Sequence, residues 1–217
     1  MKAKHRVIAI DGPAASGKSS VARELARRLD FLYVNSGTMY RAVTWYVLQN
    51  GIDPNDGASI GKCAECARIV CDLQDNESRI LINNIDPSAH LRDDAVNRNV
   101  SLVSSVPRVR EILVEKMRDY AHKYDLVMEG RDIGSVVVPE TPYKFYIDAS
   151  PEVRRQRRAA QGQRDEIATR DQADSSRPAS PLIVAKDAEV IDTSNLTITG
   201  AVDEIMVRLK AKGLEGI

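Results

Sequence analysis

The sequence has few aromatic residues, few cysteines, no excess of either charge and no long hydrophobic run. Aromatic residues make up 5% of the 217 residues, but hydrophobic residues reach 43% and charged residues 29%. This balance is that of one folded domain with a core, and it excludes a disordered tail. Lys plus Arg and Asp plus Glu both number 31, so the formal net charge is zero. Because a general polyanion binder needs many uncompensated basic groups, we expect no nucleic-acid partner, and recognition of phosphate must be local.

The short hydrophobic runs and the cysteine count exclude further classes of protein. The apolar run at 7–10 stops at Asp11, so it is too short for a signal peptide or a membrane span, and we expect no membrane partner. Three cysteines form no even disulfide framework, which favours a reducing, cytoplasmic location. Cys63 and Cys66 have C-x-x-C spacing but no evident fourth ligand, and they lie in an expected helix, so a metal or redox site is not favoured.

Short apolar runs alternate with helical patterns along most of the chain. Expected strands lie at 7–10, 31–34, 126–128, 144–147 and 188–191, and helical spacing of apolar residues runs through 21–29, 109–120 and 202–209. Continuously apolar strands separated by helices predict an α/β fold with a parallel sheet that is covered on both faces.

Two stretches break this alternation. Residues 69–86 read as strands joined by polar turns, which predicts a small antiparallel insertion. Residues 161–181 are irregular and rich in Arg, Asp, Gln and Ser. They could form a lid or an ordinary solvated loop, and composition alone slightly favours the loop.

The strongest motif follows the first expected strand. It matches G-x-x-x-x-G-K-[ST] in full and opens an expected helix, as this phosphate-binding motif requires. Its residues are Gly12, Pro13, Ala14, Ala15, Ser16, Gly17, Lys18 and Ser19. Glycines let successive amides face an anion, the lysine adds a charge for the β- and γ-phosphates, and the serine hydroxyl can ligate magnesium. The motif indicates binding of a nucleoside triphosphate without choosing among kinases, ATPases and GTPases.

Arginines point to a second phosphate. Seven arginines and no lysine lie between residues 154 and 177. Arg154, Arg157 and Arg158 have i, i+3, i+4 spacing, so a helix would place them on one face, where planar guanidinium groups can bind phosphate oxygens in pairs. The alternative is the solvated flank of a helix.

A turn in the middle of the chain adds to this pattern. Leu126–Asp132 runs from an apolar strand into Glu-Gly-Arg-Asp. Since ligands of open α/β sheets lie at the carboxyl ends of strands, Arg131 and Asp132 are expected beside the phosphate loop. Arg41 likewise follows the strand at 31–34 and is expected one turn into the next helix. The alternative for Glu129 and Arg131 is a purely structural ion pair.

Five motifs in order resemble those of bacterial cytidylate kinases, which are nucleoside-monophosphate kinases. They are I-D-G-P…G-K-S at 10–19, S-G-x-M-Y-R at 36–41, P-R-V-R-E at 107–111, E-G-R-D-I-G at 129–134 and R-D…R…A-x-P-L at 170–182. The resemblance covers almost the whole chain. It implies a P-loop fold with a five-stranded parallel sheet, helices on both faces, a monophosphate-binding insertion and a short lid.

The resemblance also implies boundaries and a reaction. A single kinase domain would span 1–217, with its core at 1–35, 107–157 and 182–217, the insertion at about 36–106 and the lid at about 158–181. The enzyme would act as a monomer and would transfer the γ-phosphoryl group of ATP to CMP or dCMP with magnesium.

Site residues follow from the matching motifs and from the arginine-rich segment. The expected catalytic residues are Lys18, Arg41, Arg131 and Arg177. ATP would contact the loop from Gly12 to Ser19, with Ser20, Arg154 and Arg158, and Ser19 would ligate magnesium. CMP would contact Ser36, Arg41, Ser101, Arg110, Arg131, Asp132, Arg170, Asp174 and Arg177.

The base-reading part of this assignment makes chemical sense by itself. A carboxylate such as Asp132 can accept from the N4 amino group of cytosine, and a guanidinium such as Arg110 can donate to N3 and O2. Uracil would leave these groups mismatched, which is costly for buried polar groups.

One departure from the family pattern concerns the magnesium shell. Asn35 stands where the family usually has Asp, and Glu129 is hypothesised to supply the missing charge. The alternatives left open are a kinase for another small acceptor such as UMP, and a non-catalytic nucleotide-responsive module.

Overall fold

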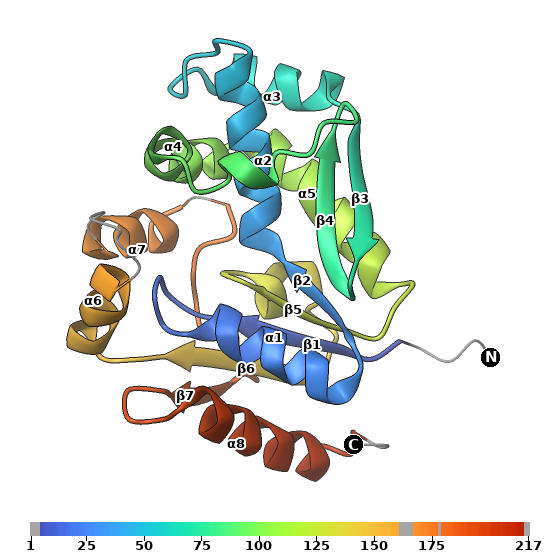
Figure 1. Ribbon diagram of the computed structural model, residues 1–217, viewed down its shortest axis with the longest axis vertical. Coiled ribbons are helices and arrows are strands. Elements are labelled where there is room, and N and C mark those ends of the chain that lie inside the picture. Colours follow the sequence, from blue (N-terminus) through green and yellow to red (C-terminus); the bar gives the residue numbers. More distant parts are fainter. Residues whose placement is uncertain (1–4, 161–166, 178, 215–217) are drawn as a thin grey trace. The chain divides into compact units, whose positions relative to one another are not determined.

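The computed structural model describes residues 5–160, 167–177 and 179–214 (Figure 1). The chain divides into two compact units. The first combines Met1–Val34 with Tyr120–Ile217, and the second is the continuous stretch Asn35–Asp119.

The first unit is built on five strands. They are β1 (Val7–Asp11), β2 (Leu32–Asn35, whose last residue belongs to the second unit), β5 (Leu126–Gly130), β6 (Tyr143–Asp148) and β7 (Glu189–Asp192). They lie in the order β2-β5-β1-β6-β7, and the pairs β1–β5, β1–β6 and β6–β7 are parallel. Every residue of β1 and β5 is buried, as expected for central strands covered on both faces. The predicted α/β fold with a mostly parallel sheet is confirmed.

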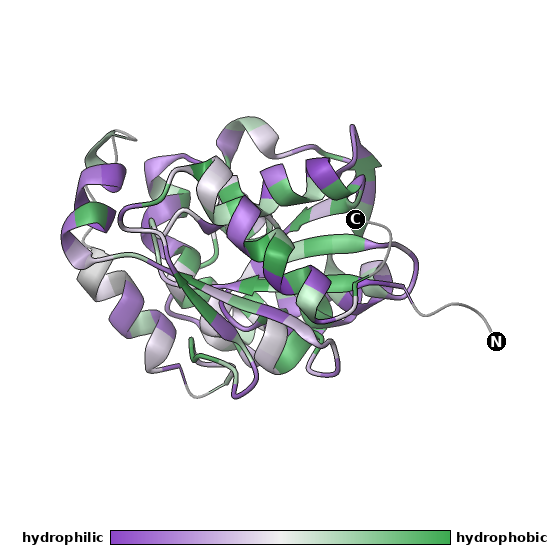
Figure 2. Cartoon of the chain, turned by 90° about the horizontal axis from the view of Figure 1, so that it is seen from below, coloured by the Kyte–Doolittle hydropathy of each residue, from purple (hydrophilic) through white to green (hydrophobic). Residues whose placement is uncertain are grey.

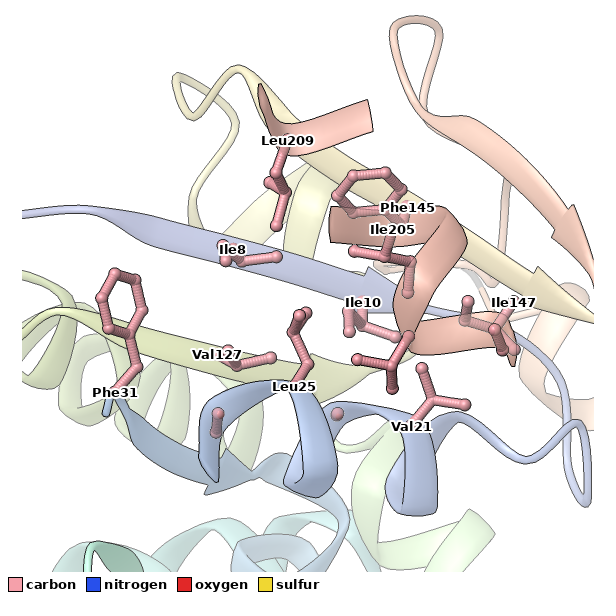
Figure 3. Packing of buried hydrophobic residues seen from close by; sticks show 14 of the residues in the cluster. Ile8, Ile10, Val21, Leu25, Phe31, Val127, Phe145, Ile147, Ile205 and Leu209 are labelled. Carbon is pink, nitrogen blue, oxygen red and sulfur yellow. The ribbon is translucent and has the colours of Figure 1, made fainter. Parts of the chain in front are cut away.

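Two helices from distant parts of the chain build the main hydrophobic core of this unit. Helix α1 (Lys18–Leu29) and helix α8 (Ile198–Ala211) contact each other and pack on the strands. Figure 3 shows side chains of both helices and of three strands meeting in this core, among them Ile8, Ile10, Leu25, Val127, Phe145, Ile147, Ile205 and Leu209. In Figure 2, hydrophobic residues gather along the central strands and alternate with hydrophilic residues on the helices. The core therefore fixes the loop between β1 and α1 at the edge of the sheet.

The arginine-rich part of the first unit is more regular than expected. Helix α6 (Pro151–Ala160) carries the three arginines with i, i+3, i+4 spacing, and α7 (Ile167–Ser175) follows it. Describing residues 161–181 as irregular was therefore wrong for the α7 segment. The apolar periodicity of α7 is weak, and its side chains Asp171 and Asp174 form hydrogen bonds to Ala14 and Arg131. A short π-helical turn, η2 (Ile133–Val137), follows β5.

The second unit contains the predicted hairpin. Strands β3 (Ile69–Gln74) and β4 (Glu77–Ile82) are antiparallel, with Ile69 opposite Ile82 and Gln74 opposite Glu77. Its helices are α2 (Ser36–Gln49), α3 (Gly57–Cys66), α4 (Asp94–Ser105) and α5 (Pro107–Ala121, whose last two residues belong to the first unit), with a 3-10 turn, η1 (Ser88–His90). In the part of the chain that the structure describes, no helix is long and apolar enough to cross a membrane.

Candidate active site

The loop between β1 and α1 needs glycine at two places. Gly12 has φ +154°, and a Cβ on it would lie 2.1 Å from the carbonyl oxygen of Ile147 in β6. Gly17 precedes α1 in a left-handed conformation with φ +92°. Both positions favour glycine because L side chains rarely adopt these angles and the neighbouring strand leaves no room at Gly12. The sequence therefore folds here into a tight loop that leads into the N-terminus of a helix.

The interior of the loop has the polar groups that an anion would use. The Ser16 hydroxyl oxygen is buried and has no hydrogen-bond partner among the described residues. The ammonium group of Lys18 is buried and donates to the carbonyl oxygen of Pro13 at 2.8 Å. Since buried polar groups are nearly always paired, an unpartnered hydroxyl in a loop of amides is a donor available to a ligand.

Two arginines of α6 contact the loop from its outer side. Arg157 donates to the carbonyl oxygen of Ser16 at 3.0 Å and to that of Thr193 at 2.7 Å. The Thr193 hydroxyl donates to the same Ser16 carbonyl oxygen at 2.8 Å. Arg154 donates to the carbonyl oxygen of Ala14 at 3.2 Å. The helix face inferred from the arginine spacing is therefore directed at the phosphate loop.

A carboxylate of α7 also lies at this loop. Asp171 accepts from the backbone amide of Ala14 at 3.1 Å and forms a short ion pair with Arg154. The amide and the guanidinium thus already bind one anionic group, which shows what kind of ligand this position accepts.

The turn after β5 lies at the same edge of the sheet. In the register of β1 and β5, Asp11 is opposite Gly130, so Gly12 and Arg131 leave the sheet side by side. The Arg131 guanidinium donates to the Asp174 carboxylate at 2.7 Å. Arg177 donates to the Asp174 carbonyl oxygen at 3.1 Å and lies 3.6 Å from its carboxylate. Arg131, Asp174 and Arg177, three of the residues expected to bind CMP, therefore form one cluster.

The other candidate residues for the acceptor lie in the second unit. Ser36 begins α2, and Arg41 on this helix donates to the carbonyl oxygen of Leu91 at 2.9 Å and to the side chain of Asn97 at 2.6 Å. Arg110, only 3% exposed, lies over the ring of Tyr40 at 5.3 Å.

Ser101 stands on α4 close to Arg110. The Ser101 carbonyl oxygen accepts from the hydroxyl of Ser104, and Arg110 donates to the carbonyl oxygen of Ser104 at 3.2 Å. Arg170 belongs to α7, but its side chain lies outside the described residues. Arg158 is half-buried on α6, and Ser20 is exposed in the first turn of α1.

Comparison with known proteins identifies the family. The cytidylate kinase family model matches residues 8–211. The chain belongs to the cytidylate kinase family. A cytidylate kinase of Clostridium botulinum (strain Loch Maree / Type A3) is 42% identical over 214 residues, covering 94% of this chain and 97% of that protein. One of Mycobacterium avium (strain 104) is 43% identical over 211 residues, covering 92% of each chain.

A solved structure supports the fold. An uncharacterized protein from Eubacterium ventriosum ATCC 27560 superposes with a TM-score of 0.51 at 12% identity, covering 95% of this chain and 99% of that one. At this identity the likeness concerns the fold alone.

The site contains three further side chains that were not among the expected site residues, although Arg157 belongs to the predicted arginine face and Asp11 and Asp171 stand inside the quoted motifs. Arg157 contacts the phosphate loop, although only Arg154 and Arg158 were expected to contact ATP. The i, i+3, i+4 spacing of the arginines placed Arg157 on the same helix face as Arg154 and Arg158. The sequence did not show that Arg157 would also contact Thr193, which lies beside the loop. Asp171 is the aspartate of the R-D motif at 170–171, but its contact with the phosphate loop could not be placed before α7 was known. Asp11, at the end of β1, is the third.

Asp11 is a buried acid at the centre of this edge of the sheet. It is 5% exposed, and its carboxylate accepts from the backbone amides of Ile133 and Gly134, both at 2.8 Å. Burial raises the pKa of Asp11 to about 7, although the two amides and the nearby Arg131 act in the opposite direction. Asp11 therefore joins the start of the phosphate loop to the turn that follows β5.

Two residues weighed for the magnesium shell have structural partners. Glu129, 2% exposed, accepts from the Tyr33 hydroxyl at 3.1 Å. Asn35 caps α2 by accepting from the backbone amide of Thr38 at 3.1 Å. The described residues contain no cluster of three or more His, Cys, Asp or Glu side chains that could hold a metal ion. Cys63, Cys66 and Cys71 are free thiols.

Proposed function

We propose that the enzyme transfers the γ-phosphoryl group of ATP to CMP or dCMP, giving ADP and the nucleoside diphosphate. Two observations support this: membership of the cytidylate kinase family, and the register of β1 and β5, which brings Arg131 to the edge of the sheet where the phosphate loop begins. The second is the one on which the reaction depends, because in-line transfer needs guanidinium groups close to the donor phosphates.

ATP occupies the loop from Gly12 to Ser19, with Ser20, Arg154 and Arg158 as further contacts. The buried Ser16 hydroxyl and the Lys18 ammonium group are suited to phosphate oxygens. The Ser19 hydroxyl, in the first turn of α1, is an oxygen ligand of the type magnesium prefers. When bound, magnesium neutralises charge on the β- and γ-phosphates.

CMP is held by the residues that the family motifs indicate. Arg41 and Arg131 bind its phosphate, and Ser101, Arg110 and Asp132 read cytosine. Ser36, Arg170, Asp174 and Arg177 complete the set. The burial of Arg110 and Asp132 favours strict reading of the base, since a mismatched buried group loses its hydrogen bonds without regaining water.

The chemical step needs positioning and charge rather than a general base, because the acceptor is already an anionic phosphate oxygen. Lys18, Arg41, Arg131 and Arg177 are the proposed catalytic residues.

A panel of acceptors tests the substrate class. CMP, dCMP and UMP are compared as acceptors in a coupled assay of ADP release with ATP and magnesium. We expect CMP and dCMP to be the preferred acceptors. Preference for UMP would overturn the base-reading assignment. ATP binding without transfer to any monophosphate would instead favour the non-catalytic module.

The role of Arg131 is tested with a matched control. We expect Arg131→Ala to remain folded and to lose on the order of 100-fold in turnover. The control is Arg155→Ala on the exposed side of α6, where Arg155 pairs only with Glu152 among the contacts described. Near-normal turnover in Arg131→Ala would contradict the role given to this residue.

The magnesium shell is tested at Asn35 and Glu129. Asn35→Asp keeps a residue suited to capping α2, so the fold should be unchanged. If Glu129 supplies the charge missing at Asn35, Glu129→Gln raises the magnesium concentration needed for half-maximal activity and Asn35→Asp lowers it. Unchanged magnesium dependence in both variants would refute the hypothesis.

A further inference from the structure

A buried threonine outside the family motifs contacts the phosphate loop. Thr193 directly follows β7 and is only 3% exposed. Its hydroxyl donates to the carbonyl oxygen of Ser16 at 2.8 Å, and the two residues are 177 positions apart in the chain. The same hydroxyl lies 2.9 Å from the carbonyl oxygen of Asp148, which also accepts from the Thr193 backbone amide at 2.8 Å. Since a buried hydroxyl is costly unless it is hydrogen-bonded, this position is suited to joining the loop to the end of β6.

Arg157 binds the same peptide group of the loop. One of its terminal nitrogens, Nη1, lies 3.0 Å from the Ser16 carbonyl oxygen and 3.0 Å from the Thr193 hydroxyl oxygen, and it donates to both. The other, Nη2, donates to the Thr193 carbonyl oxygen at 2.7 Å. A Cβ on Gly17 would lie 3.3 Å from Nη1, so the guanidinium lies directly against the loop. Thr193 therefore binds the Ser16 carbonyl through its own hydroxyl and also holds the arginine that binds it.

The direction of the Ser16 carbonyl determines the direction of the next amide. The peptide bonds of the described residues are trans, and in a planar trans peptide the C=O and the N–H point to opposite sides. Because the Ser16 carbonyl is bound on the outer side of the loop, the N–H of Gly17 is directed to the inner side, where this motif binds phosphate. Glycine populates positive and negative φ about equally, so this peptide plane benefits from a contact outside the loop.

We propose that Thr193 is a positioning residue for ATP: by binding the Ser16 carbonyl oxygen, it directs the Gly17 amide toward the nucleotide phosphates. This inference deepens the proposed function and rests on the binding of ATP by the loop. Without the hydroxyl, the peptide group between Ser16 and Gly17 can rotate, and an amide that must be reoriented on binding contributes less affinity. ATP binding therefore weakens. CMP binding is unchanged, because Thr193 forms its hydrogen bonds with Ser16, Asp148 and Arg157.

A matched set of variants tests the proposal. Thr193→Val replaces the hydroxyl by a methyl group of similar size, and Thr193→Ser keeps the hydroxyl. The control is Thr141→Val. Thr141 is also buried, and its hydroxyl donates to the carbonyl oxygen of Val7, at the opposite end of β1 from the phosphate loop. The control thus removes a buried hydroxyl that binds a backbone carbonyl of the same unit, but away from the nucleotide.

Calorimetry gives Kd for ATP, and steady-state kinetics give KM for ATP and for CMP. We expect Thr193→Val to raise Kd and KM for ATP about tenfold, the loss of one hydrogen bond to a charged group, and to leave KM for CMP within about twofold. Thr193→Ser should restore ATP binding to within about twofold of wild type, because its hydroxyl can bind the same carbonyl. Thr141→Val should lower Tm and leave Kd for ATP unchanged.

The alternative outcomes separate this role from the proposed function. If wild type binds no ATP, the proposed function is refuted, and this inference falls with it. If wild type binds ATP and Thr193→Val binds it equally tightly, or if KM for ATP and for CMP rise equally, only the positioning role is refuted. An equal loss of ATP affinity in Thr141→Val would also refute it, because the effect would then come from stability.

A second variant covers the case in which Thr193→Val does not fold. Arg157→Lys keeps the positive charge beside the loop, but an ammonium group cannot bind the carbonyl oxygens of Ser16 and Thr193 as a planar fork does. We expect Kd for ATP to rise about threefold, with KM for CMP unchanged. Unchanged ATP binding in Arg157→Lys would overturn the proposal.

Discussion

The ionisation of Asp11 should make the free energy of unfolding depend on pH. In the unfolded chain this carboxyl ionises at its ordinary pKa of 3.8, whereas burial raises the pKa in the folded chain to about 7. Between these pH values the folded state binds one more proton than the unfolded state, so raising the pH favours unfolding. The stability that the protonated group contributes is complete below about pH 4 and is lost by about pH 7.

The size of this loss of stability follows from the difference between the two pKa values. From 3.8 to about 7, at about 1.4 kcal/mol per pH unit, the loss amounts to about 4 kcal/mol. This is a large part of the stability of an ordinary domain. The charges that face Asp11 partly oppose each other, since Asp132 raises its pKa and Arg131 lowers it. Tyr146 of β6 also lies near enough for its own pKa to respond to Asp11.

Urea unfolding at several pH values from 4 to 8 measures this effect. Asp11→Asn has no proton to lose, so its free energy of unfolding relative to wild type should rise by about 4 kcal/mol across this range. Asp187→Asn is a contrasting control, because Lys144 holds the pKa of Asp187 below its usual value and stability from that pair is lost as the pH falls. A constant difference between Asp11→Asn and wild type from pH 4 to 8 would refute the reasoning.

Three further results are expected. Lys18→Ala should lose on the order of 100-fold or more in turnover while keeping its far-UV circular dichroism, because the ammonium group serves the phosphates. Gly12→Ala should unfold at a clearly lower temperature and should not retain tight ATP binding in calorimetry, because its Cβ would meet the Ile147 carbonyl oxygen at 2.1 Å. Asp171→Asn should bind ADP a few-fold more tightly, since Asp171 competes for the Ala14 amide; weaker binding would show that it supports the loop instead.

The features that repeat along the chain were open to prediction. Five apolar runs became the five strands of the first unit, and the phosphate loop lies between a buried strand and an amphipathic helix as its motif requires. The position of Arg131 followed from the rule that parallel strands end at a common edge, and the register of Asp11 with Gly130 agrees with it. Local pattern and simple topology were sufficient for these.

Features that depend on a partner distant in sequence could not be predicted from the sequence. Helix α4 was not predicted, although Val96, Val100 and Val103 form a short buried stripe on it. The turn η2 depends on a carboxylate from β1, and α7 contacts the loop through Asp171. For η2 and α7 no periodicity within the segment predicts such contacts, because the group in contact lies more than a hundred residues away in the chain.

The order of the strands has a consequence for synthesis on the ribosome. β1 lies between β5 and β6, yet the whole of Asn35–Asp119 is made before either neighbour exists. The continuous second unit can form its internal contacts as it emerges from the ribosome. β1 is synthesised earlier, but its apolar residues stay exposed in the nascent chain until β5 and β6 have been made. Ile205 and Leu209 of α8, with Leu214 after it, join the core last. We therefore expect ribosome-bound chains that stop before α8 to contain a protease-resistant second unit beside an open, aggregation-prone first one.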